Sequence, residues 1–135
     1  MTDISHLIEP SYAFQDLIGY TQEDWREGYA RFELTLGDHH MNRYGIPHGG
    51  VLATLLDTVM GFSGCFTGDR QRPALAMTLS MNVSYLAQAQ GRRLTAEGTR
   101  TGGGRKTFFA DGKILDETGA LLATSTGVFR VRGKA

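Results

Sequence analysis

The sequence of 135 residues has a single cysteine and no excess of charge of either sign. One thiol, Cys65, cannot form a disulfide within this sequence or supply a zinc cage made of cysteines. Its neighbours offer no base, so we expect a packed side chain rather than a nucleophile. The 14 basic and 14 acidic side chains give a formal net charge of zero. No electrostatic attraction to nucleic acid is therefore expected.

A hydrophobic run long enough to cross a membrane is also missing. The longest apolar stretch, 49–62, is interrupted by Asp57 and is shorter than the roughly 20 residues that a spanning helix needs. The first residues, 1–5, lack the charged and apolar regions of a signal peptide. These features predict a cytoplasmic protein without a membrane partner.

Length and composition indicate one folded domain. Hydrophobic residues make up 41% of the chain and aromatic residues 10%, which is typical of a globular protein and argues against disorder. A chain of this length forms one core rather than two. We expect a single domain over 1–135, with an N-terminal helical extension over 1–24 and a core over about 25–132.

Strand patterns dominate that core. Apolar and polar residues alternate over 28–37 and again over 74–85, as in strands with one buried face. In the second run, the expected apolar face comprises Leu75, Met77, Leu79, Met81, Val83 and Tyr85, and the polar face comprises Thr78, Ser80, Asn82 and Ser84. Three further strands are expected over about 92–101, 105–115 and 120–132, separated by glycine-containing turns.

One helix, expected over about 49–62, lies between the first two of these strands. Strands in direct succession normally pair as antiparallel hairpins. The order therefore predicts an α+β fold in which a curved, antiparallel, five-stranded sheet surrounds a central helix. This helix is apolar nearly all round, so we expect a second subunit to cover the part that the sheet leaves open.

The start of the helix has features of a reactive site. The segment before it, Ile46-Pro47-His48, is expected to be extended, because a residue before proline is kept out of the helical region. Gly49 and Gly50 then allow a tight turn and a close approach to a ligand. The first amides of a helix lack partners and carry a partial positive charge, which suits an oxygen that becomes negative during a reaction.

Asp57 follows about two turns later in an apolar environment. Burying a carboxylate among leucines costs several kcal/mol unless it is hydrogen-bonded, paired or placed at a cleft. A working site would compensate for that cost. The alternative is that Asp57 lies on the solvated stripe of an amphipathic helix.

These residues together resemble a known family. The pattern Asn42-x-x-Gly45-x-x-His48-Gly49-Gly50, with Asp57 on the following helix, is similar to the motif of the hotdog-fold acyl-CoA thioesterases of the phenylacetate-pathway (PaaI) type. The segments 81–86 and 116–123 also resemble a strand and the last hairpin of that family. The resemblance covers roughly 25–132 and implies the hotdog fold, with no cofactor.

The resemblance further implies a homodimer, often paired again into a homotetramer, with active sites at the dimer interface. The Gly49 amide would polarise the thioester carbonyl with help from Asn42. Asp57 of the partner chain would act as general base or as nucleophile. Thr78 would hold the attacking water, and His48 would shape the loop.

Elementary geometry also favours a site made by two chains. Hydrolysis of a thioester needs donors for the oxyanion and a base or nucleophile on the other side of the carbonyl carbon. Gly49 and Asp57 are eight residues apart on one helix, about 12 Å at the helical rise, which is too far to serve one carbonyl. Combining Gly49 of one chain with Asp57 of another removes that difficulty.

The expected substrate is an aryl- or medium-chain acyl-CoA. Arg105 and Lys106, beside three glycines, are candidates for contacts with the coenzyme A phosphates, although strand-end charges of this kind are often only solvated. Tyr85 is a candidate for the acyl pocket, and Gly50 for close backbone approach to the substrate.

Several alternatives stay open at this point. Asn42 also suits an unusual turn conformation, and Thr78 is an ordinary strand residue. A metal site at His39, His40 and His48 lacks a suitably spaced carboxylate, so none is expected. A hotdog hydratase or dehydratase and a non-catalytic acyl-CoA-binding protein remain as other functions, although the Asp-x-x-x-x-His pattern of the former is absent.

Overall fold

The computed structural model describes residues 3–132 as two α-helices, a short 3-10 helix and six strands. In chain order these elements are α1 (Ala13–Ile18), β1 (Thr21–Arg26), β2 (Tyr29–Thr35), the 3-10 helix η1 (Asp38–His40), α2 (Gly49–Ser63), β3 (Leu75–Tyr85), β4 (Arg93–Gly103), β5 (Thr107–Asp116) and β6 (Leu121–Arg132).

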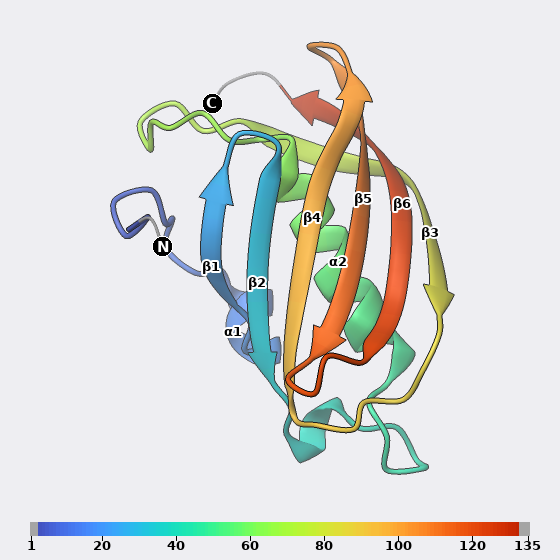
Figure 1. Cartoon of the computed structure of the whole chain (residues 1–135). Coiled ribbons are helices and arrows are strands. Elements are labelled where there is room, and N and C mark those ends of the chain that lie inside the picture. Colours follow the sequence, from blue (N-terminus) through green and yellow to red (C-terminus); the bar gives the residue numbers. More distant parts are fainter. Residues whose placement is uncertain (1–2, 133–135) are drawn as a thin grey trace.

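All six strands form one antiparallel sheet in the order β1-β2-β4-β5-β6-β3. The sheet curves around α2, which crosses its concave face (Figure 1). The predicted α+β arrangement of a curved antiparallel sheet around one central helix is confirmed. The predicted number of five strands is wrong, because β1 adds a sixth at one edge.

β1 was not predicted because its buried residues do not alternate. Its pairing with β2 shifts register between Gln22 and Asp24. This bulge separates the two buried side chains, Gln22 and Trp25, by three positions instead of two, so the period of two that indicates a strand is lost.

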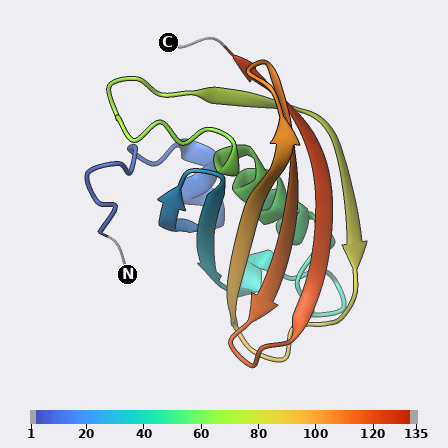
Figure 2. The ribbon, with the colours of Figure 1, turned by 45° about the horizontal axis from the view of Figure 1, so that its top comes forward.

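The N-terminal segment is less helical than expected. Only α1 is an α-helix, beginning three residues after Pro10, and the last part of the expected extension is strand β1. Ile4 and Leu7 are buried against Trp25, Phe62 and Phe66. This segment therefore packs beside the loop that follows α2 (Figure 2).

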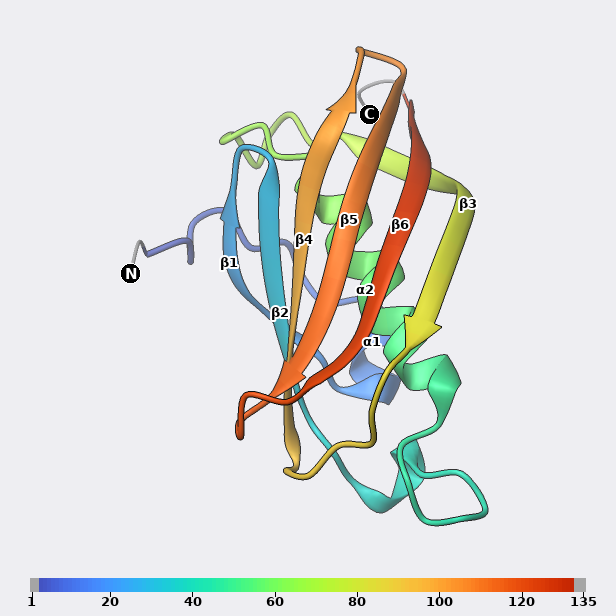
Figure 3. The same cartoon turned by 45° about the vertical axis from the view of Figure 1, so that its right-hand side comes forward.

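β3 forms the other edge of the sheet, next to α2 (Figure 3). Its pairing with β6 shifts register between Thr78 and Ser80, so the strand changes face at Leu79. Thr78 pairs with the buried Phe129 and Met81 pairs with Gly127, which places Thr78 and Met81 on the same side of the sheet. The prediction that they occupy opposite faces is wrong, because a bulge reverses the alternation.

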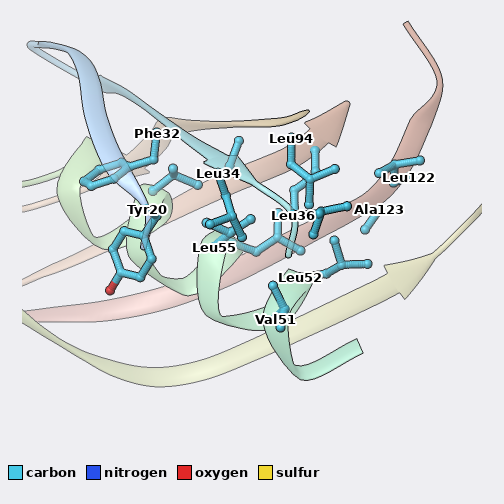
Figure 4. Close-up of a cluster of buried hydrophobic side chains, with 14 residues drawn as sticks. Tyr20, Phe32, Leu34, Leu36, Val51, Leu52, Leu55, Leu94, Leu122 and Ala123 are labelled. Atoms are coloured by element: carbon cyan, nitrogen blue, oxygen red, sulfur yellow. The ribbon is translucent and has the colours of Figure 1, made fainter. Parts of the chain in front are cut away.

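The main core lies between α2 and the sheet (Figure 4). Leu55, Leu56 and Val59 of α2 are completely buried. The helix lies so close to β4 that a Cβ atom at Gly98 would be 2.2 Å from the carbonyl oxygen of Val59. Only glycine fits at this crossing, and the close contact fixes which face of α2 points away from the sheet.

Candidate active site

At the start of α2, the Gly49 amide has no hydrogen-bond partner among residues 3–132. His48 is the N-cap residue, and its Nδ1 accepts a hydrogen bond of 2.8 Å from the Gly50 amide. The Val51 amide donates to the carbonyl of His48. Within the described residues, the Gly49 amide has no such acceptor. It therefore remains available to a ligand oxygen at the positive end of the helix.

The ring of Tyr85 lies directly against this helix start. Its hydroxyl donates to the carbonyl oxygen of Gly49 over 2.9 Å, and a Cβ atom at Gly49 would be 3.3 Å from the ring. Tyr85 and Gly49 also line a cavity of about 340 Å³ together with Asn42. Tyr85 thus links the end of β3 to the first residue of α2.

Asn42 holds the loop that precedes the helix. Its Oδ1 accepts hydrogen bonds from the amides of Tyr44, at 2.9 Å, and Ile46, at 3.4 Å. Its backbone does not adopt a positive φ, since no described residue other than glycine does. A structural role for Asn42 in this turn is therefore present, but it comes from the side-chain hydrogen bonds and not from a left-handed backbone. Its side-chain oxygen fixes the loop, which leaves the amide nitrogen to donate to a ligand.

Asp57 lies in the middle of α2, on the stripe that points away from the sheet. It is half-buried, whereas Leu55 and Leu56 before it are fully buried. Oδ1 of Asp57 accepts a hydrogen bond of 2.6 Å from the Thr78 hydroxyl. The bulge at Leu79 makes this contact possible, because it turns Thr78 toward the helix. The carboxylate is thereby oriented while its second oxygen stays open.

A second cavity, of about 330 Å³, adjoins Asp57 and Thr78. Its walls are mostly apolar and aromatic. They include three residues that the sequence did not indicate, namely Glu9, Tyr12 and Trp25. All three come from the N-terminal part of the chain, where no motif pointed to a site. Only the three-dimensional packing of that segment against α2 reveals them.

The two cavities share no lining residue. One contains Gly49 and Asn42, and the other contains Asp57 and Thr78. Gly49 and Asp57 lie on the same helix about 12 Å apart along its axis. The structure therefore brings the predicted site residues together in two pairs, and a single chain does not unite those pairs.

Arg105 and Lys106 lie in the turn between β4 and β5. Arg105 borders a separate hollow with Ser63 and Gly64, at the C-terminal end of α2. Within one chain these two cations line neither the Gly49 cavity nor the Asp57 cavity.

His40 and Cys65 have hydrogen-bonding and packing roles in the fold. The Nδ1 atom of His40 accepts from the Gly37 amide, and its Nε2 lies 2.6 Å from the carbonyl oxygen of Ile18. Burial raises the pKa of the Cys65 thiol to about 11, with a smaller contribution from the charge of Glu9. This thiol is protonated at neutral pH, which agrees with the expected packing role.

Over residues 3–132, no three His, Cys, Asp or Glu side chains come together as a group that could hold a metal ion. In the same range no helix has both the length and the apolar character needed to cross a membrane.

Comparisons with a family model and with a known protein both point to thioesterases. Residues 44–123 match the model of the thioesterase superfamily. Acyl-coenzyme A thioesterase 13 of Mus musculus is 28% identical over 93 residues, which cover 67% of this chain and 64% of the mouse protein.

Solved structures show the same fold. The PaaI protein of the phenylacetic acid degradation operon of E. coli superimposes with a TM-score of 0.78 at 21% identity, covering 90% of this chain and 86% of that protein. A thioesterase protein of Streptococcus pneumoniae, solved with coenzyme A, superimposes with a TM-score of 0.73 at 27% identity, covering 85% and 87%. The predicted hotdog fold is confirmed. The family match covers more than half of the chain and includes both Gly49 and Asp57, so this protein belongs to the thioesterase superfamily of thioester hydrolases.

Proposed function

We propose that this protein hydrolyses an acyl-CoA thioester to the free acid and coenzyme A. The observation that supports this most directly is the pairing of an oriented carboxylate, Asp57, with a free helix-start amide, Gly49, in a thioesterase-superfamily chain. The names of the mouse relative and of the streptococcal structure point to acyl-CoA and coenzyme A as the ligands.

In the proposed reaction, the thioester carbonyl oxygen accepts a hydrogen bond from the Gly49 amide. The side-chain amide of Asn42 gives a second donor from the same cavity. Both donors gain strength as negative charge develops on that oxygen, so they stabilise the transition state more than the ground state. His48 supports them by fixing the Gly50 amide and with it the first turn of the helix.

Asp57 acts on the opposite face of the carbonyl carbon. As a general base it removes a proton from water, whose oxygen adds to the carbon; the C–S bond then breaks, and the coenzyme A thiolate takes the proton. As a nucleophile it would instead add to the carbon and expel the coenzyme A thiolate as the C–S bond breaks, which leaves an anhydride; water then opens the anhydride to the free acid and regenerates the carboxylate. In both cases Thr78 orients the carboxylate, and its oxygen can also accept a hydrogen bond from the water.

The two halves of the site meet if two copies pair through β3. This edge strand is long and exposes the apolar residues Leu75, Met77 and Leu79, a surface that favours pairing with another strand. Asp57 is bonded to Thr78, and Gly49 is bonded to Tyr85, seven positions further along β3. Antiparallel pairing centred between Met81 and Asn82 would place Thr78 opposite the partner's Tyr85.

Such a dimer would therefore bring Asp57 of one chain toward Gly49 of the other. Its two sites would be equivalent, as two-fold symmetry requires. A further pairing of dimers into a tetramer is part of the proposal. Arg105, Lys106 and the backbone at Gly50 are proposed to contact the coenzyme A portion, and Tyr85 is proposed to border the bound thioester.

The acyl group is proposed to enter the cavity beside Asp57. Tyr12, Trp25, Phe62 and Phe129 give this cavity aromatic walls, which suit an aryl group or an aliphatic chain of medium length.

The direct test is release of free thiol from acyl-CoAs that range from acetyl to palmitoyl and include phenylacetyl and benzoyl derivatives. The wild-type protein is expected to hydrolyse some of them, and Asp57→Ala is expected to lose about a hundredfold or more in turnover. Thr54→Ala is a matched control, because Thr54 lies one turn earlier on the same stripe and its hydroxyl donates a hydrogen bond to the Gly50 carbonyl rather than to Asp57. Near-normal turnover of Asp57→Ala would contradict the proposed mechanism.

A further inference from the structure

The cavity beside Asp57 is closed by a part of the chain that lies outside the family match. Asp57 and Thr78 belong to the matched segment, 44–123. Glu9, Tyr12 and Trp25, which form the facing wall, precede that segment. Asp57 and Thr78 thus lie within the segment matched to the family, whereas this wall is built from the N-terminal segment that precedes it.

This wall is held firmly in place. Trp25 donates a hydrogen bond of 3.0 Å from Nε1 to the carbonyl oxygen of Phe62, and the two rings meet edge to face with centroids 5.3 Å apart. Tyr12 and Tyr20 share a hydrogen bond of 2.5 Å between their hydroxyl groups. Ile4 and Leu7 are buried against the same cluster. The segment that contains Glu9 therefore has fixed points on both sides.

The cavity extends along α2 from Asp57 toward the loop that follows the helix. Asp57 and Gly61 of α2 line it one turn apart, and Cys65, two residues beyond the end of the helix, continues the same wall. Glu9 lies toward the Cys65 end, since Leu7, two residues before it, packs against Phe62 and Phe66 at the end of α2 and in the loop that follows. The cavity thus has a carboxylate near each end and apolar or aromatic walls between them.

Among residues 3–132, Glu9 is a polar group without a partner. It is half-buried, and over the described residues its carboxylate accepts no hydrogen bond and forms no ion pair. An apolar acyl group that filled the cavity would remove water from this carboxylate without replacing its hydrogen bonds, which is unfavourable. An acyl group with a donor at its far end would replace them.

We propose that Glu9 is a specificity-determining residue that selects acyl groups ending in a hydrogen-bond donor, such as a hydroxyl or an amino group. This inference rests on the proposed acyl-CoA thioesterase function. It adds the chemistry at the distal end of the substrate, which the residues around Asp57 and Gly49 do not determine.

The test compares matched pairs of substrates. Initial rates are measured for octanoyl-CoA against omega-hydroxyoctanoyl-CoA, and for phenylacetyl-CoA against para-hydroxyphenylacetyl-CoA. For the pair that is hydrolysed faster, the wild-type protein is expected to favour the hydroxylated member by about tenfold in kcat/KM. A hydrogen bond to a charged group at a partly exposed site discriminates between substrates by roughly that factor. An amino-terminated analogue is expected to behave like the hydroxylated one.

Variants then assign the preference to Glu9. Glu9→Leu is expected to remove or reverse the preference for the hydroxylated substrate, while hydrolysis of the unsubstituted substrate is preserved. Glu9→Gln keeps an acceptor oxygen and is expected to retain part of the preference for the hydroxylated substrate. Glu23→Leu removes a carboxylate of β1 that does not line this cavity, and its substrate ratio is expected to equal that of the wild type.

The outcomes are distinguishable. Hydrolysis of both members with the same ratio in the wild type, Glu9→Leu and Glu9→Gln would overturn the role of Glu9 and leave the thioesterase function intact. Absence of hydrolysis of all acyl-CoAs would contradict the proposed function and this inference together.

Discussion

Thr78 and Asp57 are joined by a hydrogen bond of 2.6 Å across 21 positions of sequence. The bond links the edge strand β3 to the central helix and exists because a bulge at Leu79 turns Thr78 inward. A carboxylate held by one oxygen keeps its other oxygen directed at one place. Such fixed orientation is the property that a catalytic base or nucleophile needs.

Removal of this hydroxyl is expected to reduce turnover more than binding. Thr78→Val keeps the shape of the side chain, and we expect kcat to fall about tenfold with little change in KM, because the carboxylate loses its orientation rather than its charge. Thr78→Ser restores the donor and is expected to recover most of the rate. Equal kinetics for the valine and serine variants would show that the hydrogen bond is irrelevant to hydrolysis.

The helix start gives a second prediction. At Gly49 an added Cβ atom meets the Tyr85 ring at 3.3 Å, so Gly49→Val is expected to displace the first amide and lower kcat/KM at least tenfold. Tyr85→Phe removes only the hydrogen bond to the Gly49 carbonyl and is expected to have a smaller effect. Unchanged kinetics in Gly49→Val would dismiss the oxyanion role of this amide.

Much of the fold could be predicted because its pattern is local. The alternation of β2 and the apolar run of α2 are visible in the sequence, and the structure has both elements within one or two residues of the expected bounds. β1 and the faces of β3 could not be predicted, since each contains a bulge that breaks the period of two. A bulge is set by pairing with another strand, and a single strand sequence does not reveal it.

The candidate site also combines residues that the sequence could predict with residues that it could not. Asn42, Gly49 and Asp57 are close in sequence and form a recognisable motif. Glu9 and Trp25 come from segments that reach the cavity only after the N-terminal part has folded against α2. Their contribution depends on tertiary packing and has no local pattern.

The hairpin before β6 gives a prediction for stability and pH. Hydrogen bonds from the Thr118 side chain and from the amides of Gly91, Gln90 and Thr118 hold the pKa of Asp116 far below its ordinary value of 3.8. Because the pKa is lowered in the folded state, the stabilisation is fully present above about pH 4 and is lost as the pH falls further. Asp116→Asn is therefore expected to have a lower Tm than the wild type at pH 7.

Thermal unfolding followed at several pH values checks this directly. The difference in Tm between Asp116→Asn and the wild type is expected to be constant from pH 7 to about pH 5 and to shrink below about pH 4, where Asp116 of the unfolded wild-type chain begins to be protonated while the folded chain still holds the carboxylate. A difference that stayed the same at low pH would assign the effect to packing rather than to the charge of Asp116.

The proposed mechanism requires Gly49 of one chain and Asp57 of another at the same site. Alone, Gly49→Val is expected to retain at most about a tenth of wild-type activity, and Asp57→Ala at most about a hundredth. When the two variants are unfolded, mixed in equal amounts and refolded together, half of the dimers contain one chain of each, and one of their two sites has both intact residues. Recovery of about a quarter of wild-type activity is therefore expected. Activity no higher than that of the separate variants, with mixed dimers present, would contradict a site shared between two chains.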